Sequence, residues 1–545
     1  MSREDCEQKE AFLHERETER PKSKFLQFLL AKDEIITTKF VTFLLNYEPF
    51  RAIKAHTKAL ELSCDVCFSI AIRAAVSLHS YSGANKPPMY GDYEAQRHWQ
   101  EITYNFSPKG WYKNSSNNNL EYWGLDYPPL TAYHSYVNAY IASKINSSFV
   151  DLKTSHGFES ERHKTFMRST VLAADTLIYL PACILVASFI DKVFKQNIFL
   201  QLCVLFVTYP GLILIDNGHF QYNNISLGLL LLAVYFILTD SNNLAALSFS
   251  LALNYKQMEL YHAFPFFTYL LRSCLVENCF SRKLIKFLKI ACVVTLTFLA
   301  LWLPWLTSLD SLISTASRLF PLSRGVFEDK VANIWCSLNV IYKFKNKFVN
   351  TQMALICLVT TLSAALPTNL NLFACGKKET FLYTLQNTAT AFFLFSFQVH
   401  EKSILLVALP SICLYGFMPF AVTCFLKVSI LSILPLIIKD GLTIAYFSLV
   451  VAYNAILNAF LAEQESERHM SNNSLQRLNK VLDFLILIAS LAAVWLPPPS
   501  HLPHLWAVII SVICCGFFLI FFIMGHINQF NYWPNIVKII LNKKV

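Results

Sequence analysis

The sequence of 545 residues has little charge, because Asp, Glu, Lys and Arg make up only 15% of it, whereas ordinary soluble domains carry roughly 25%. Glycine is also scarce, with 14 residues, while phenylalanine occurs 45 times and hydrophobic residues reach 54%. A soluble protein could not bury so many large apolar side chains without leaving adhesive patches on its surface. The composition therefore excludes an ordinary soluble protein and predicts an integral membrane protein.

A basic stripe of the kind that binds nucleic acid is also lacking. The net charge is +10, but the Lys and Arg residues are scattered along the chain. In membrane proteins such an excess is typical of cytoplasmic loops. We therefore expect no nucleic-acid partner.

The 15 cysteines do not form a zinc-site pattern. Cys64 and Cys67 open a hydrophobic segment and have no second pair at zinc-site spacing. Most of the others, such as Cys357 and Cys413, lie within apolar runs, which favours small buried hydrophobic residues. We expect no metal and no cofactor.

No internal repeat is visible, which weakens the interpretation as an inverted-repeat transporter. The polar, acidic start of the chain does not match a cleavable signal. We expect a cytoplasmic N-terminal tail over residues 1–60, a transmembrane domain over 61–526 and a cytoplasmic C-terminal tail over 527–545.

Apolar runs of about twenty residues recur along the chain and match a hydrocarbon core of about 30 Å. They predict an all-α polytopic membrane protein with about fourteen transmembrane helices. The expected spans are 62–79, 129–147, 171–190, 197–215, 222–239, 244–270, 285–307, 351–370, 382–399, 403–418, 420–438, 441–461, 479–496 and 506–526. The second span is interrupted by Tyr, His, Ser and Asn.

An even number of spans places both termini on one side of the membrane. Loops rich in Lys and Arg then fall on that side, which indicates the cytoplasm; they are 148–168, 271–284, 371–381 and 462–478. The opposite side receives two long loops, about 80–128 and 308–350, and the short segments 400–402 and 497–505. By this count Asp216 and GHFQYN (218–223) are cytoplasmic, and His219 is left out of the predicted site. The alternatives are that this segment re-enters the membrane or that the count is off by one span.

The first long loop sets acids, an Arg and a His among aromatic rings. Asp92, Glu94, Arg97 and His98 lie in YGDYEAQRHW, and Asp126 follows in YWGLDYPPL. Aromatic faces with interspersed carboxylates suit a sugar, because rings stack on its C–H faces and acids bond its hydroxyls. The alternative is an interfacial aromatic belt with solvated charges.

The second loop and a short turn supply cations on the same side. FPLSRGVFEDKVANIW contains Arg324, Glu328, Asp329 and Lys330, and VHEKS contains His400 and Lys402. Cations here could bind a lipid phosphate through charge-assisted hydrogen bonds. The alternatives are that long loops translocate regardless of charge and that helix ends place their charges in water.

Two further cations, Arg73 and Lys256, lie inside expected spans. Such cations usually face a bundle interior. We expect them to pair with Asp175 or Glu259.

Several long motifs stand out along the chain. They are HSYSG (79–83), PPMYGDYEAQRHWQEIT (87–103), YWGLDYPPLTAYHSY (122–136), GHFQYN (218–223), NYKQMELYH (254–262), FPLSRGVFEDKVANIWC (320–336) and HEKS (400–403). These motifs resemble those of the dolichyl-phosphate-glucose-dependent alpha-1,3-glucosyltransferases of the endoplasmic reticulum. GDYEAQRHW looks most like the member that adds the first glucose to the nine-mannose lipid-linked oligosaccharide.

The resemblance implies a GT-C architecture, a multi-pass protein of the endoplasmic reticulum with its active site in lumenal loops. It implies inverting transfer of glucose from dolichyl phosphate glucose to the terminal mannose of a dolichyl-pyrophosphate-linked oligosaccharide, in N-glycosylation. The alternatives are the paralogue that adds the second glucose and a membrane transporter or lipid flippase, which would carry its charges on helices near the midplane.

In this resemblance Asp92 matches the proposed general base and Asp126 the second acidic position of the first loop. We expect desolvation between Tyr90 and Tyr93 to raise the pKa of Asp92. The expected substrate- and phosphate-binding residues are Glu94, Arg97, His98, Arg324, Glu328, Asp329, Lys330, His400 and Lys402. Asn217 stands where the family pattern has His, so no catalytic role is assigned to that position.

Overall fold

A computed structural model describes residues 48–320, 330–467 and 473–531. The chain divides into two compact units, residues 1–65 and 66–545. The described residues of the first unit are helical and belong to α3 (Glu48–Ser77), which runs across the boundary between the units. All of the predicted site residues lie in the second unit.

Eight helical segments of the described residues are long and apolar enough to cross a membrane. This confirms the prediction of a polytopic all-helical protein, since the only β pairing in the described residues is one isolated bridge between Ser115 and Asn118. The segments are Glu161–Phe194 (α6 Glu161–Ala174, η3 Asp175–Tyr179 and α7 Leu180–Phe194), Phe199–Phe220 (α8 Phe199–Val207, α9 Pro210–Leu212 and η4 Ile213–Phe220), Phe280–Trp305 (α13 Phe280–Trp302 and η6 Leu303–Trp305), Asn350–Cys375 (α16), Pro419–Lys439 (α19 Pro419–Ser432 and α20 Leu434–Lys439), Thr443–Ser466 (within α21 Thr443–Glu467), Asn473–Trp495 (α22) and Leu505–Phe530 (α23).

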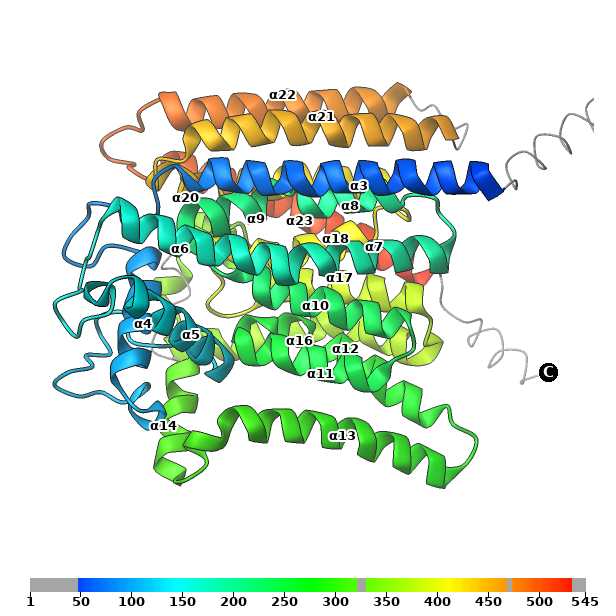
Figure 1. Ribbon diagram of the computed structural model, residues 1–545. Coiled ribbons are helices and arrows are strands. Elements are labelled where there is room, and N and C mark those ends of the chain that lie inside the picture. Colours follow the sequence, from blue (N-terminus) through cyan, green and yellow to red (C-terminus); the bar gives the residue numbers. More distant parts are fainter. Residues whose placement is uncertain (1–47, 321–329, 468–472, 532–545) are drawn as a thin grey trace, which may run out of the picture. The chain divides into compact units, whose positions relative to one another are not determined.

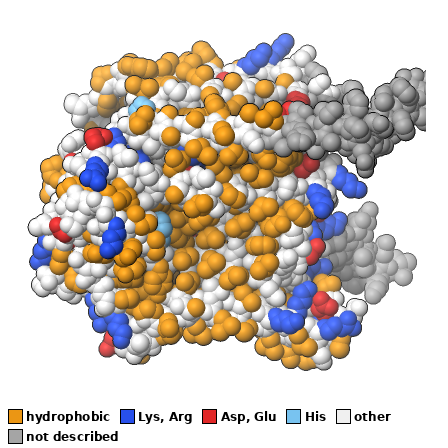
Figure 2. All heavy atoms as spheres, viewed as in Figure 1, with side chains coloured by type: hydrophobic (Ala, Val, Ile, Leu, Met, Phe, Trp, Pro, Cys, Tyr) orange, Lys and Arg blue, Asp and Glu red, His pale blue; other side chains and the backbone are white. Residues whose placement is uncertain are grey.

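Shorter helices pack among the long segments. They are α10 (Asn223–Leu238), α11 (Asn242–Tyr255), α12 (Leu260–Leu275), α17 (Lys378–Phe395) and α18 (Leu405–Cys413). Helix α10 is apolar along its length. Helix α10 packs on α11, as Figure 1 also shows, and α17 packs on α12, α16 and α23. In Figure 2, hydrophobic side chains cover most of the middle of the visible face, while Lys and Arg gather toward its ends, as expected for a lipid-facing surface.

Short elements form the connections around the site, and Figure 1 shows α4, α5 and α14 together at one end of the long helices. Asp92 and Glu94 lie in the first turn of α4, where the helix dipole favours negative charge. Pro129 begins α5, a position that suits its fixed φ. The elements are α4 (Asp92–Asn105), η1 (Pro108–Gly110), α5 (Pro129–Ile145), η2 (Ser147–Phe149), η5 (Gln257–Glu259), α14 (Leu309–Leu319), α15 (Ile334–Ile341), η7 (Phe344–Asn346) and η8 (Glu401–Ile404).

The predicted second span, 129–147, is wrong as a membrane crossing. It forms α5, which packs on α4 of the first long loop, and the chain that leaves α5 returns to α4. Just beyond α5, the backbone N–H of Lys153 donates to Glu101 of α4 over 2.8 Å. The segment 148–168 therefore starts on the same side as the first long loop, contrary to the prediction. The polar side chains that interrupt the run, such as His134, take polar partners at this end of the fold.

The predicted span 244–270 is also wrong as a single helix. Helix α11 ends at Tyr255, Lys256 is extended, and α12 starts at Leu260. Gln257 at this break donates to the backbone carbonyl of Asp126 over 3.0 Å, which places the break beside the first long loop. The predicted topology therefore contains one crossing too many, at 129–147, and one too few, at 244–270. The two errors cancel, so the predicted side of the membrane is wrong only for the segments between these two spans.

Candidate active site

Asp92 is held at the start of α4 by groups from distant parts of the chain. Its Oδ2 receives hydrogen bonds from His219 Nε2 at 3.0 Å, from Gln221 Nε2 and from Lys402 Nζ. The side chain is 22% exposed. Among the described residues no group donates to Oδ1, so one oxygen of this carboxylate is fixed and the other is available to a substrate.

The charges around Asp92 decide its protonation. Burial by itself raises the pKa of this carboxyl, but Lys402 and His219 hold the pKa well below its usual range. The prediction of a raised pKa is therefore wrong. The neighbouring aromatic rings are visible in the sequence, whereas the two cations reach Asp92 only through the fold.

His219 lies between two carboxylates. Its Nδ1 is 2.5 Å from Asp440 Oδ2, and its Nε2 contacts Asp92. Both His219 and Asp440 are buried. The prediction that GHFQYN lies on the opposite side from the first loop is therefore wrong, and His219 belongs to the site. In the sequence, the signal for this role is the motif GHFQYN, which supplies two of the donors to Asp92.

The turn at HEKS meets the first loop as predicted. Lys402 lies in η8 and bonds Asp92, and its Nζ is 3.3 Å from His219 Nε2. His400 is the residue that precedes η8. The Lys402 side chain is 20% exposed, so this cation lies at the mouth of the site rather than deep in the helices.

Lys256 lies behind the same site. Its Nζ donates to Asn223 Oδ1 at 2.5 Å and to Gln221 Oε1 at 3.5 Å, and it lies over the ring of Tyr127. Because Gln221 also donates to Asp92, one amide joins this cation to the carboxylate. Tyr127 follows Asp126, so the second predicted acid lies in the same neighbourhood.

The pairing predicted for the two buried cations is confirmed for one of them. Arg73 Nε lies 3.3 Å from Asp175 Oδ1. Lys256 has the amide partners above, while Glu259 bonds His262 Nδ1 at 2.7 Å.

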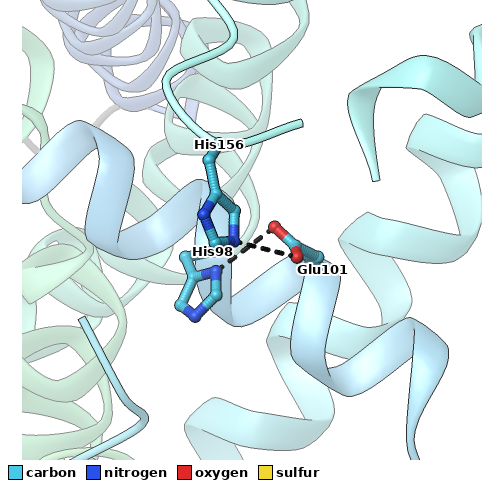
Figure 3. A group of neighbouring side chains, drawn as sticks. All are labelled: His98, Glu101 and His156. Carbon is cyan, nitrogen blue, oxygen red and sulfur yellow. Dashed lines mark hydrogen bonds and ion pairs between the residues drawn. The ribbon is translucent and has the colours of Figure 1, made fainter. Parts of the chain in front are cut away.

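Glu94, Arg97 and His98 are buried and bond one another instead of Asp92. Arg97 donates to Glu94 at 2.6 Å and 2.7 Å and lies 2.8 Å from Glu101 Oε2. Glu101 also contacts His98 Nδ1 and His156 Nε2, each at 3.2 Å (Figure 3). Burial raises the pKa of Glu101, but His156, His98 and Arg97 lower it well below its usual range.

The ligand atoms of His98, Glu101 and His156 lie within 4.8 Å of one another, a spacing that could hold a metal ion. Arg97 opposes this use, because its NH2 lies 3.5 Å from His98 Nδ1 and beside the same carboxylate. A divalent ion would have to approach a fixed guanidinium. We interpret these side chains, which we call the Glu101 clamp, as the link between α4 and residues 153–156.

The structure describes only one of the residues predicted to bind substrate in the second loop. Arg324, Glu328 and Asp329 lie outside the described residues. Lys330 is described, and its backbone carbonyl accepts a hydrogen bond from Ser511 Oγ at 2.5 Å.

Comparison with known proteins shows which family this chain resembles over most of its length. The model of the family described as "ALG6, ALG8 glycosyltransferase family" matches residues 69–524. The chain is 49% identical over 471 residues to a protein of Drosophila melanogaster named "Probable dolichyl pyrophosphate Man9GlcNAc2 alpha-1,3-glucosyltransferase", covering 86% of this chain and 98% of the relative.

Two vertebrate relatives carry the name "Dolichyl pyrophosphate Man9GlcNAc2 alpha-1,3-glucosyltransferase". The protein of Pongo abelii is 46% identical over 484 residues, covering 85% of this chain and 95% of the relative. The protein of Gallus gallus is 46% identical over 488 residues, covering 86% of this chain and 96% of the relative. With its polytopic helical fold and a match over most of its length, this chain belongs to the ALG6, ALG8 glycosyltransferase family.

Proposed function

We propose that this protein transfers glucose from dolichyl phosphate glucose to the terminal mannose of the dolichyl-pyrophosphate-linked nine-mannose oligosaccharide. The linkage is alpha-1,3, the anomeric centre inverts, and the reaction belongs to N-glycosylation. The names of the relatives support the acceptor and the linkage. The observation that carries the chemistry is Asp92, with Oδ2 fixed by three donors and Oδ1 free among the described residues.

The architecture in this proposal is a GT-C fold in the membrane of the endoplasmic reticulum with fourteen crossings. The five shorter helices α10, α11, α12, α17 and α18, together with α3, join the eight long segments to give this number. The end that carries α4 and Asp92 faces the lumen, and both termini face the cytoplasm.

Asp92 acts as the general base. Its Oδ1 receives the proton of the acceptor hydroxyl while the acceptor oxygen attacks C1 of glucose. The bond from C1 to the phosphate oxygen breaks on the opposite face, and its electron pair leaves with dolichyl phosphate. The depressed pKa keeps Asp92 ionised at neutral pH, and the proton moves once the attacking oxygen becomes acidic. Water then takes the proton from Asp92.

Cations at the mouth of the site stabilise the leaving phosphate. Lys402 is partly exposed beside the base, and His400 precedes it on the same turn. Fixed positive groups aimed at a leaving oxyanion lower the barrier because they need no reorganisation. Arg324 and Lys330 remain proposed phosphate ligands, and Glu328 and Asp329 remain proposed substrate contacts.

The other predicted residues act around the base. Asp126 orients the sugar or the first loop, and Gln257 fixes its backbone. Glu94, Arg97 and His98 support the substrate-binding surface through their mutual ion pairs and the Glu101 clamp rather than through direct contact with Asp92.

The test is transfer from synthetic dolichyl phosphate glucose to the nine-mannose lipid-linked acceptor, comparing purified wild type with Asp92→Asn. Wild type is expected to transfer glucose, and the variant to lose at least about a hundredfold in kcat, because it lacks the base. Size-exclusion profiles and melting temperatures establish that both proteins are folded. Transfer only to an acceptor that already carries one glucose would identify the paralogous reaction, and no transfer to either acceptor would favour a transporter.

A further inference from the structure

The chain behind Asp92 continues inward through His219 to Asp440. The distances are 3.0 Å from Asp92 Oδ2 to His219 Nε2 and 2.5 Å from His219 Nδ1 to Asp440 Oδ2. The side chains of His219 and Asp440 are 3% and 2% exposed, so both groups are shielded from bulk water. One imidazole therefore bridges a partly exposed carboxylate and a buried one.

The chemistry of these groups decides how the bridge is protonated. Ionised carboxylates only accept hydrogen bonds, and a neutral imidazole donates from one ring nitrogen alone. A neutral ring would leave one nitrogen lone pair facing a carboxylate lone pair. Both contacts are satisfied when His219 carries a hydrogen on each nitrogen. Two ionised carboxylates then surround one imidazolium, a charge-assisted arrangement.

We propose that Asp440 and His219 form a charged positioning pair for Asp92. Asp440 keeps His219 in the imidazolium form, and His219 keeps Asp92 ionised with Oδ2 turned away from the substrate. Neither residue touches the reacting atoms. The inference rests on the transfer reaction proposed above and assigns a role to two residues behind its base.

The pair differs from a proton relay. His219 Nε2 already carries a hydrogen, so it does not take the acceptor proton, which stays on Asp92 Oδ1 until water removes it. The number of protons on His219 and Asp440 is unchanged through the transfer.

Other charged groups face this pair and stay in place in the test. Lys402 contacts both Asp92 and His219, and Lys256 reaches Asp92 through Gln221. Arg168 donates to the backbone carbonyl of Gly218, next to His219, at 2.7 Å. Asp216, one helical turn earlier, accepts from Asn223 and from the backbone of Asn224.

The experiment is the pH profile of kcat/KM for wild type, Asp440→Asn and His219→Gln, with dolichyl phosphate glucose and the nine-mannose acceptor. Both variants remove positive charge from the neighbourhood of Asp92, directly or by letting His219 deprotonate. The pKa of Asp92 then rises, and the acidic limb of the profile moves to higher pH by about one unit or more. Above that limb, Asp440→Asn recovers much of its activity.

The matched control is His262→Gln. His262 is also buried and bonds a carboxylate, Glu259 Oε2 at 2.7 Å, but makes no hydrogen bond to Asp92. Its loss is expected to lower stability and to leave the acidic limb in place. In the His219→Gln background, adding Asp440→Asn is expected to move the limb no further, because Asp440 acts through His219.

The outcomes separate the two proposals. An acidic limb that stays at the wild-type pH in Asp440→Asn and His219→Gln, with transfer reduced evenly at every pH, would overturn the positioning pair. A limb that moves equally in His262→Gln would do the same. Failure of wild type to transfer glucose at any pH would instead overturn the proposed function.

Discussion

A single carboxylate oxygen receives three donors from two separate segments of the chain. Oδ2 of Asp92 is bonded by His219, Gln221 and Lys402, which are 127, 129 and 310 residues away in the chain. This convergence fixes the rotamer of the base and lowers its pKa at the same time. Position and protonation of Asp92 are therefore two results of the same contacts.

Lys402→Gln is expected to raise KM for the lipid donor and to lower kcat, each by about tenfold or more, because one cation serves both the base and the leaving phosphate. Steady-state kinetics with varied donor concentration measures both effects. The control is Lys427→Gln, which removes a buried lysine that also bonds a carboxylate, Asp483 at 2.7 Å. An unchanged donor KM in Lys402→Gln would contradict the phosphate role.

The sequence predicts part of this site. Asp92 and Lys402 lie in motifs whose residue types indicate the chemistry, and the fold brings them together. His219 was excluded by a span count, and nothing in the local sequence singles out Asp440. The contacts of His219 and Lys402 with Asp92 depend on which ends of distant helices meet, and this one sequence does not specify that arrangement. For the same reason the predicted direction of the pKa shift at Asp92 is wrong.

Helix α4 is anchored from behind by the Glu101 clamp. Its buried carboxylate accepts from Arg97, Ser155 and the backbone of Lys153, and contacts two His rings. Such a pair stabilises a fold mainly because losing one partner leaves the other charge uncompensated. The clamp therefore holds the helix whose first residue is the base.

Glu101→Gln is expected to lower the free energy of unfolding by about 3 kcal/mol at neutral pH. Since the folded pKa of Glu101 is depressed, its contribution is fully present above the unfolded pKa of about 4.3 and is lost as pH falls below it. The difference in melting temperature from wild type should narrow below about pH 4. Glu121→Gln, an exposed acid of the same loop, is the control; an equal effect of both substitutions would contradict the clamp.

The sequence predicts the long apolar helices better than it predicts the short helices and breaks. The long apolar helices follow from run length, because a run of about twenty hydrophobic residues has few alternatives to a crossing. Helix α5 and the break at Lys256 could not be predicted this way, since average hydropathy ignores where single polar residues find partners. His134 and Gln257 find theirs at the site end, which decides both cases.

At the scale of the whole molecule, the two errors in the predicted spans change the side of the membrane assigned to three basic residues. Arg162, Lys164 and Arg168, assigned by charge bias to the cytoplasm, lie on the same side as the first loop. Arg168 donates to the backbone of Ser80 and of Gly218, and Lys164 to that of Leu78. Lys164 and Arg168 donate hydrogen bonds to nearby backbone carbonyl groups, so the tendency of Lys and Arg to lie in cytoplasmic loops does not decide their side of the membrane.

Side-specific labelling tests this arrangement in sealed microsomes. In a background without exposed cysteines, Asp240→Cys is expected to react with a membrane-impermeant maleimide without permeabilisation, because its exposed side chain lies at the opposite end of α10 from the site. Lys153→Cys is expected to react only after permeabilisation. Labelling of Lys153→Cys in intact microsomes would contradict the arrangement.

The order in which the base acquires its partners has a consequence for biosynthesis. Asp92 leaves the ribosome early, whereas Lys402 and Asp440 are translated only after roughly three quarters and four fifths of the chain, respectively. Until then Asp92 lacks the groups that lower its pKa and fix the position of its Oδ2. We therefore expect a chain that ends before these residues to be inactive, so that unfinished enzyme does not consume the lipid donor.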